Sequence, residues 1–222
     1  MAGRRARILP GAGLAFGLLA ASYPLGLGEW CRTWGATPDE VASNLPGDEL
    51  LPDADVVTTR AIPIQAPPDR IWPWLVQMGN GRAGTYTYDW IQNLFGLDMH
   101  SAKVILPQFQ DLKAGDEFPI GTGMMRIELL QPASLLVTRV PEWHWVRIFR
   151  LFPDTDVTRL VLRNRIAYPG EGSAAMIWHR LISEQGGLLM ESKMLRGIRE
   201  RAEGATADLW PDWWWDRPAE PR

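Results

Sequence analysis

The sequence has little cysteine and little histidine, with Cys31 as its single cysteine and three histidines among 222 residues. One cysteine cannot form an intrachain disulfide, and these residues show none of the spacings that hold structural zinc. The sequence also has no G-x-S-x-G or H-E-x-x-H motif and no serine, histidine and acid set at a telling spacing. We therefore expect no metal site, and no catalytic constellation can be recognised.

Positive charge is not concentrated in this chain either. The formal net charge is −3, and lysine and arginine form no dense cluster. Nucleic acid is therefore not expected as a partner, because binding it requires a basic patch. Tryptophan is instead abundant, and its twelve residues fall in groups, among them Trp213, Trp214 and Trp215.

The segment Gly79–Gly84 has the spacing G-x-G-x-x-G, which is typical of dinucleotide-binding loops. Such a loop works between a strand and the N-terminus of a helix, where free amides face the phosphates. Here Pro68 and the helical spacing of the apolar residues after it predict a helix over 68–78 that ends at the glycines. We therefore predict a helix C-cap and a tight turn in which glycine supplies positive φ, and no cofactor.

The N-terminus has the features of a membrane segment. Three arginines precede a run from Ile8 to Gly28 that carries no charge and is long enough to cross a bilayer as a helix. The positive-inside rule then places the N-terminus in the cytoplasm and the rest of the chain outside it. A cleaved signal peptide, with its cleavage site near Ala20 to Ser22, and a soluble N-terminal helix in a cytoplasmic protein are the alternatives.

Residues 1–30 make up this N-terminal segment, and the chain after it is predicted to have three regions. Residues 31–55 form an acidic connector that we expect to be solvated, with a short helix whose capping box is Thr37 and Glu40. Residues 56–203 form one ligand-binding domain, and residues 204–222 form a tail rich in tryptophan and proline. The three adjacent tail tryptophans could lie at a bilayer interface or pack back on the domain.

Within 56–203, hydrophobic patterning predicts a first strand near 56–67, the helix 68–78 and a second helical piece over 87–102. A meander of antiparallel strands follows, in which Met125, Ile127 and Leu129 share one face. In the last strand, Leu160, Leu162, Asn164 and Ile166 lie opposite Arg159, Arg163 and Arg165. A long helix over 174–203 ends the domain, and the two glycines Gly186 and Gly187 within it suggest a kink or a close approach.

This order of elements resembles the START-like, helix-grip (SRPBCC) superfamily, which includes polyketide cyclase/dehydrase-like and lipid-transfer proteins. The segments that carry the resemblance are RTWGATPDEV, WPWLVQMGNGRAG, YDW and QDLKAGDE, and they are most similar to an actinobacterial-type subgroup. The resemblance covers Pro38 to Glu203. It implies an α+β fold in which a curved antiparallel sheet wraps around the long C-terminal helix, with an apolar cavity between them for a lipid, sterol, polyketide or aromatic ligand.

The candidate site residues combine suitable chemistry with a predicted place near that cavity. Candidates for acid–base catalysis are His144, Tyr86 and Tyr88, while Arg147 offers a charge. His144 alternates with Trp143 and Trp145 on a predicted strand, so it faces the cavity only if those tryptophans face away. The candidate ligand-binding residues are Arg82, Tyr86, Tyr88, Trp90, Trp145, Asn164, Leu181 and Leu188. Asp89 is expected to anchor the turn between the helical pieces, and His100 to lie at the surface.

These observations favour a protein that binds or carries a hydrophobic small molecule while held at the membrane by residues 8–28. Two alternatives stay open. One is a cyclase or dehydratase that acts on an aromatic or polyketide-like substrate, and the other is an interaction module whose cavity is filled by its own side chains. The contents of the cavity distinguish the three functions. A cavity without an ionisable group favours the carrier, and a buried histidine or tyrosine with a shifted pKa favours the enzyme. The absence of a cavity favours the interaction module.

Overall fold

The computed structural model describes residues 27–94, 96–120, 123–170 and 172–204, and within the last helix it describes side chains from residue 185 onward. The helices and strands are, in chain order, α2 (Leu27–Thr33), α3 (Pro38–Ala42), β1 (Val56–Ile64), α4 (Pro68–Val76), α5 (Asp89–Leu94), β2 (Glu117–Ile120), β3 (Gly123–Gln131), β4 (Leu135–Val140), β5 (Trp145–Asp154), β6 (Val157–Ile166) and α6 (Ser173–Ala202). Short 3-10 turns lie at Asp48–Leu50, Pro107–Phe109 and Pro141–Trp143.

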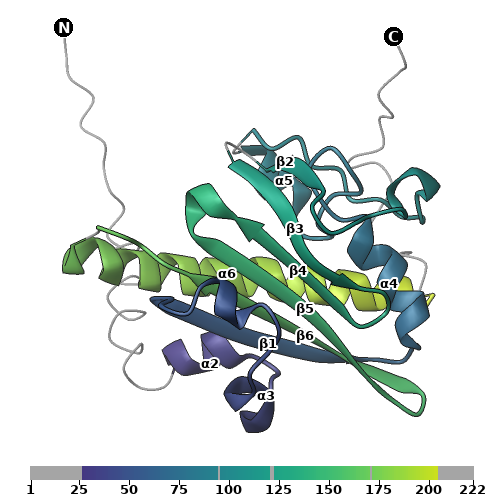
Figure 1. Cartoon of the computed structure of the whole chain (residues 1–222), viewed down its shortest axis with the longest axis horizontal. Helices are drawn as coiled ribbons and strands as arrows, with labels where there is room; N and C mark the ends of the chain where they lie inside the picture. The colour runs from purple at the N-terminus through teal and green to yellow at the C-terminus, as the bar shows by residue number, and fades with distance from the viewer. Residues whose placement is uncertain (1–26, 95, 121–122, 171, 205–222) are drawn as a thin grey trace, which may run out of the picture.

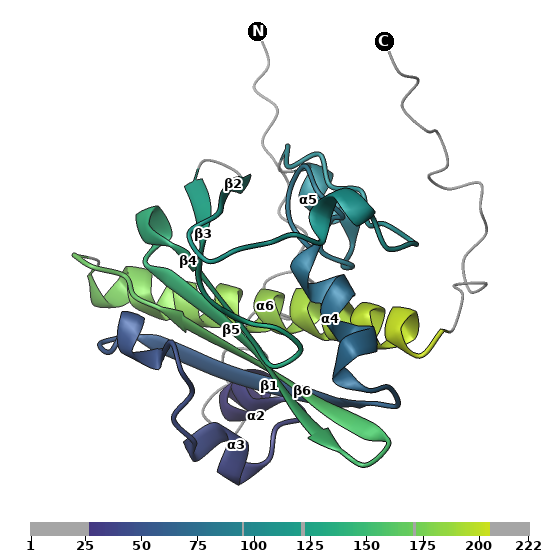
Figure 2. The ribbon, with the colours of Figure 1, turned by 45° about the vertical axis from the view of Figure 1, so that its right-hand side comes forward.

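The six strands form one antiparallel sheet in the order β1-β6-β5-β4-β3-β2. Figure 1 shows α6 running along one face of this sheet, which we call the inner face, and Figure 2 shows the sheet curling around it. Helix α4 lies beside α6 on the same side. The predicted α+β class, with an antiparallel meander and a long C-terminal helix, is confirmed.

Alternation along the strands directs one set of apolar side chains to the inner face. On β6, Leu160 and Leu162 are fully buried in the inner core together with Phe149 of β5, as the predicted alternation of β6 requires. Helix α6 contributes Leu195 and Ile198 to the same core. Each such side chain contributes about 1.5–3 kcal/mol when it is removed from water, so this layer is the main source of stability.

The expectation that residues 31–55 form a solvated connector holds only in part, because Asp39, Glu49 and Asp53 are exposed whereas Leu45 and Gly47 are buried. Residues 35–52, which we call the N-terminal strap, cover the outer face of the sheet, where Val137, Ile148 and Val161 form a second core with Leu45 of the strap. The outer positions of the central strands are apolar and must be buried.

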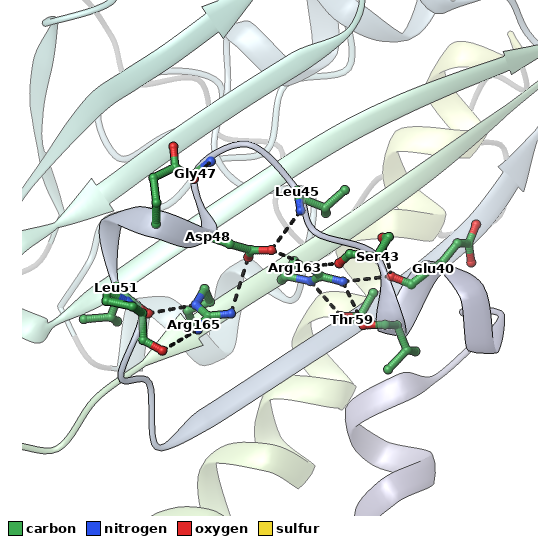
Figure 3. Close-up of polar contacts among 12 residues, drawn as sticks. Glu40, Ser43, Leu45, Gly47, Asp48, Leu51, Thr59, Arg163 and Arg165 are labelled. Carbon is green, nitrogen blue, oxygen red and sulfur yellow. Dashed lines mark hydrogen bonds and ion pairs between the residues drawn. The ribbon is translucent and has the colours of Figure 1, made fainter.

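Two acids of the strap pair with outer arginines of β6, Glu40 with Arg159 and Asp48 with Arg163. Figure 3 shows the pair of Asp48 and Arg163. The acidic composition thus reflects pairing with arginine for Glu40 and Asp48, and exposure to solvent for Asp39, Glu49 and Asp53.

Two local predictions about the strap and α4 hold in the structure. The Thr37 hydroxyl accepts from the Glu40 amide at 3.2 Å and the Glu40 carboxylate accepts from the Thr37 amide at 2.7 Å, which confirms the capping box. Helix α4 begins at Pro68 as predicted and ends at Val76, two residues before the predicted end. Of the helix predicted over 87–102, the described part is helical only at Asp89–Leu94.

A β-bulge changes the faces of β3. The register with β4 shifts between Ile127 and Leu129, and one extra residue reverses the alternation beyond that point. Ile127 lies in the inner core, whereas Leu129 packs on the outer core. The prediction that Met125, Ile127 and Leu129 share a face is therefore wrong for Leu129.

The N-terminal membrane prediction falls mostly outside the described residues. Residues 8–26 and the tail tryptophans Trp213, Trp214 and Trp215 are not among them, and within the described ranges no helix has the length and apolar character needed to span a bilayer. Helix α2, which begins at Leu27, packs against β1 and α6 and buries Cys31.

The glycines of α6 differ in what surrounds them. The helix is continuous from Ser173 to Ala202, so Gly186 and Gly187 do not interrupt it. A Cβ at Gly186 would meet nothing within 4 Å, whereas a Cβ at Gly197 would lie 2.7 Å from the Tyr86 carbonyl oxygen. Gly197, which the sequence did not single out, is the residue that allows α6 to pass close to the loop after α4.

Candidate ligand-binding cleft

A cleft lies between the inner face of strands β2 to β5 and a wall made by α4 and the loop after it. Its volume is about 430 Å³ when the part open to solvent is included. The walls stand close together, so the cleft has room for only a few water molecules. The lining side chains are mostly aliphatic, aromatic or thioether groups. They belong to Leu75, Val76, Met78, Gly79, Thr85, Leu112, Phe118, Ile120, Met125, Ile127, Leu136, Thr138, Arg147 and Phe149.

Arg147 is the one ionisable residue among those lining residues. It projects from β5 on the same face as Phe149, because residues two apart on a strand share a face. Its guanidinium carbon lies 4.2 Å from the centre of the Trp145 ring, and its Nε donates to the Asn164 Oδ1 at 3.1 Å. The side chain is half-buried, and burial lowers the pKa of Arg147, an effect that the Glu191 carboxylate opposes and the Arg60 guanidinium adds to.

Arg147 belongs to a polar cluster on the inner face that comprises Thr58, Arg60, Arg147, Asn164 and Glu191. Arg60 of β1 is buried and forms a short ion pair with Glu191 of α6, and its Nε donates to the Cys31 carbonyl at 2.9 Å. Asn164 of β6 donates to the Glu191 Oε1 at 3.1 Å and so connects this pair to Arg147. Each member thus has a polar partner, as buried charges require.

Asn164 and Trp145 were both predicted as ligand-binding residues. Asn164 is buried, and its Oδ1 also accepts from the Trp145 Nε1 at 2.9 Å. The Trp145 ring stacks on Trp143 with 6.3 Å between ring centres and supports the Arg147 guanidinium from one side. Neither residue lines the cleft itself, so both act on it through Arg147.

The glycine loop forms part of the cleft wall, as a turn rather than a phosphate cradle. Gly79, Gly81 and Gly84 all have positive φ, and Gly79 and Gly84 form an antiparallel bridge, which confirms the predicted turn. The predicted glycine C-cap is wrong, because α4 ends earlier and its cap is Gln77 in the right-handed helical region. A Cβ at Gly84 would lie 2.8 Å from the His100 carbonyl, so glycine is also needed there for packing.

Arg82 holds this loop in place. Its Nη2 donates to the Val76 carbonyl at 2.9 Å and to the Phe109 carbonyl at 3.2 Å, and its guanidinium lies between the Phe109 and Phe118 rings. Burial lowers the pKa of Arg82, which Asp116 partly offsets. The structure thus places Arg82 in contact with the end of α4, the 3-10 turn Pro107–Phe109 and β2, and outside the residues that line the cleft.

Tyr86 lies in the inner core and not in the cleft. Its hydroxyl donates to the Trp74 carbonyl at 3.0 Å and accepts from the Gln77 Nε2 at 2.9 Å, and burial raises the pKa of Tyr86 to about 12. The Arg201 guanidinium covers the ring at 4.5 Å. Tyr86 is therefore held as a neutral phenol whose hydrogen bonds are taken by the protein.

The other residues predicted near the cavity mouth lie at the surface or at turns. Tyr88 is half-buried and its carbonyl accepts the first bonds of α5, while Trp90 is 53% exposed. Asp89 accepts from the amide and the hydroxyl of Ser101 at 2.7 and 2.6 Å, which confirms its predicted anchoring role. His100 is exposed beside Asp98, as expected.

His144 is not on a strand, contrary to the prediction. Pro141–Trp143 form a 3-10 turn and His144 ends it in the left-handed region, with φ of 46°. Proline at the start of the turn favours this arrangement, and β5 begins only at Trp145. The His144 side chain is exposed at the end of the sheet and does not line the cleft.

Helix α6 contributes no described residue to the cleft lining. Leu188 is half-buried on α6 away from the cleft, and the side chain of Leu181 lies outside the described residues. The contribution of α4 and β2, through Leu75 and Phe118, was not foreseen. Among the described residues, no group of three or more histidine, cysteine, aspartate or glutamate side chains is placed to hold a metal ion.

Comparison with known proteins gives weak similarities only. No protein-family model matches the chain and no curated protein matches it. Among solved structures the chain is similar to protein NE0264 from Nitrosomonas europaea, with a TM-score of 0.45 and 13% identity over 69% of this chain and 97% of that one. It is also similar to DynU16, a protein of the dynemicin biosynthetic locus, with a TM-score of 0.39 and 13% identity over 64% of this chain and 46% of that one. The chain therefore matches less than half the length of DynU16, and similarities of this size identify no family and no function.

Proposed function

We propose that this protein binds a hydrophobic small molecule in the cleft between strands β2 to β5 and α4. The observation that supports this most directly is the composition of the cleft, an apolar lining with one charged group, Arg147. Small-molecule sites have this character, with apolar walls that supply affinity and a few polar groups that fix orientation. The described lining holds no histidine, tyrosine, aspartate, glutamate or lysine, so acid–base catalysis has no obvious donor or acceptor there.

The cleft must widen to accept such a ligand, because its walls stand close together. One wall is α4 with the glycine loop, and Gly81 of that loop has φ of 67° with nothing within 4 Å of the position of a Cβ. We propose that this loop moves when ligand enters. The gain that drives binding is burial of apolar ligand area at about 25 cal/mol per Å².

A cleft-filling variant tests the proposed function. Leu112→Trp adds bulk to a half-buried lining residue, whereas Ile105→Trp adds the same ring at an exposed position outside the cleft. We expect Leu112→Trp to weaken binding of the neutral dye Nile red to the full-length protein by about tenfold or more, and Ile105→Trp to leave it unchanged. Equal effects of the two variants would show that the dye binds elsewhere.

We also propose that the protein is held at the membrane by residues 8–28, with the N-terminus in the cytoplasm and the domain outside. Support comes from the charge-free run and from the arginines that precede it. A reporter fused after Arg222 that is active only outside the cytoplasm should be active. Activity of a cytoplasm-only reporter at the same position would contradict the orientation.

A further inference from the structure

Arg147 has more hydrogen-bonding capacity than the protein uses. A guanidinium has five N–H donors, and the single hydrogen bond of Arg147 among the described residues is from its Nε to the Asn164 Oδ1. None of the described carboxylates lies within 4 Å of it as an ion-pair partner, since the Glu191 carboxylate is taken by Arg60 and Asn164. The two Nη nitrogens, with four N–H groups, therefore have no protein acceptor within the described ranges.

The Arg147 side chain keeps some contact with solvent, since the residue is half-buried and not fully buried. Arg147 lines the cleft, so a molecule in the cleft can reach its Nη donors.

The surroundings hold the guanidinium in one position. The Asn164 Oδ1 accepts from both the Arg147 Nε and the Trp145 Nε1, and the Asn164 Nδ2 donates to Glu191, so the amide cannot rotate without breaking these bonds. The Trp145 ring lies against one face of the guanidinium. With Nε taken, the pair of Nη nitrogens forms the free end of the fork, which matches the two oxygens of a carboxylate.

We propose that the ligand of the cleft is an amphipathic carboxylic acid, whose carboxylate accepts from both Nη nitrogens of Arg147 while its apolar body lies along Leu136 and Phe149. The proposal rests on the proposed function and names its ligand class. One cation that has no carboxylate partner among the described residues is balanced by one negative charge. A phosphate monoester carries about −1.5 to −2 at neutral pH and would leave charge unbalanced in an apolar site. A neutral alcohol would leave the guanidinium without a counter-ion.

Three ligands with the same alkyl chain test this choice in the full-length protein: decanoic acid, decan-1-ol and decyl phosphate, each measured by displacement of Nile red. We expect decanoate to bind about tenfold or more tightly than decanol, because a charge-assisted pair of hydrogen bonds is present only for the acid. In Arg147→Met the ratio should fall to about one while the affinity for decanol stays within about threefold. Arg150→Met on the outer face of the same strand is the matched control and should keep the native ratio.

The outcomes separate this inference from the proposed function. Equal binding of acid and alcohol to the native protein, or a preference that survives in Arg147→Met, would overturn the carboxylate while leaving a hydrophobic ligand. Tighter binding of decyl phosphate than of decanoate would overturn the choice of anion. Failure of dye and all three ligands to bind would overturn the proposed function as well. The comparison on native protein decides the inference even if Arg147→Met does not fold.

Discussion

Arg163 fastens the N-terminal strap to the sheet, and its removal should destabilise the whole domain. Its side chain is 3% exposed and projects from the outer face of β6. It donates to the Thr59 hydroxyl at 3.0 Å, to the Asp48 carboxylate at 2.7 Å and to three strap carbonyls, which are those of Glu40, Val41 and Ser43 (Figure 3).

The cost of Arg163→Met follows from what is left behind. The Asp48 carboxylate, 16% exposed, would keep only the more distant Arg165, at 3.5 Å, as its cationic partner, and three carbonyls would lose a donor. Removing one partner of a buried ion pair costs about 3–5 kcal/mol. That is a large part of the roughly 5–15 kcal/mol by which a domain is stable.

Urea unfolding followed by tryptophan fluorescence measures this cost. With a slope of about 2 kcal/mol per molar urea, a loss of about 3 kcal/mol lowers the midpoint by about 1.5 M. Arg150→Met is the control on the same outer face, because Arg150 has one side-chain hydrogen bond, to the Ser134 hydroxyl, and should lose about 1 kcal/mol. A midpoint for Arg163→Met no lower than that of Arg150→Met would refute the role assigned to the strap.

Three further predictions concern other parts of the fold. Gly197→Ala should destabilise the protein, because the added Cβ would lie 2.7 Å from the Tyr86 carbonyl oxygen. Gly186→Ala should stabilise it by about 0.5–1 kcal/mol, because the added Cβ meets nothing within 4 Å. The midpoint of thermal unfolding should therefore fall for the first variant and rise for the second. Burial opposes ionisation of Glu40, but hydrogen bonds from Arg159 and the Thr37 amide outweigh it and the pKa of Glu40 lies below its usual value. The stability from Glu40 is therefore full above about pH 4.3 and is lost as the pH falls further, so Glu40→Gln should flatten the acid limb of a stability–pH curve. Burial raises the pKa of Tyr86 to about 12. The stability that the neutral phenol contributes to the fold is therefore full below about pH 10 and is lost as the pH rises toward 12. Spectrophotometric titration should show one fewer late-ionising tyrosine in Tyr86→Phe.

Features that depend on neighbouring residues could be predicted from the sequence. The capping box of Thr37 and Glu40, the start of α4 at Pro68 and the turn at Gly79–Gly84 each follow from the local chemistry of a few residues. The inner face of β6 was read correctly from its alternation, which no bulge interrupts. The order of the strands along the chain and the final helix also followed from hydrophobic patterning.

Features that depend on distant residues could not be predicted. Six acids between Gly35 and Asp55 indicated a solvated segment, because the sequence does not show that arginines of β6 lie across from two of them, Glu40 and Asp48. The bulge in β3 depends on its pairing with β4, and it moved Leu129 to the other face.

The candidate site was predicted only in part for the same reason. Asn164 and Trp145 were named, yet their role depends on Arg147, which they hold. The lining combines α4, the glycine loop and four strands, and no short motif marks such a set. One signal could have identified the cleft, namely a charged residue among apolar residues on the inward face of a strand. Arg147 is such a residue, because it lies two positions before Phe149 on β5.

Native mass spectrometry of the full-length protein purified from its own host, with extraction of any bound molecule, tests the central claim most directly. We predict a co-purifying hydrophobic species, and if Arg147 binds its head group, that species is a carboxylic acid. A protein that carries no such molecule and also fails to bind a neutral apolar dye would contradict the claim that the cleft is a ligand site.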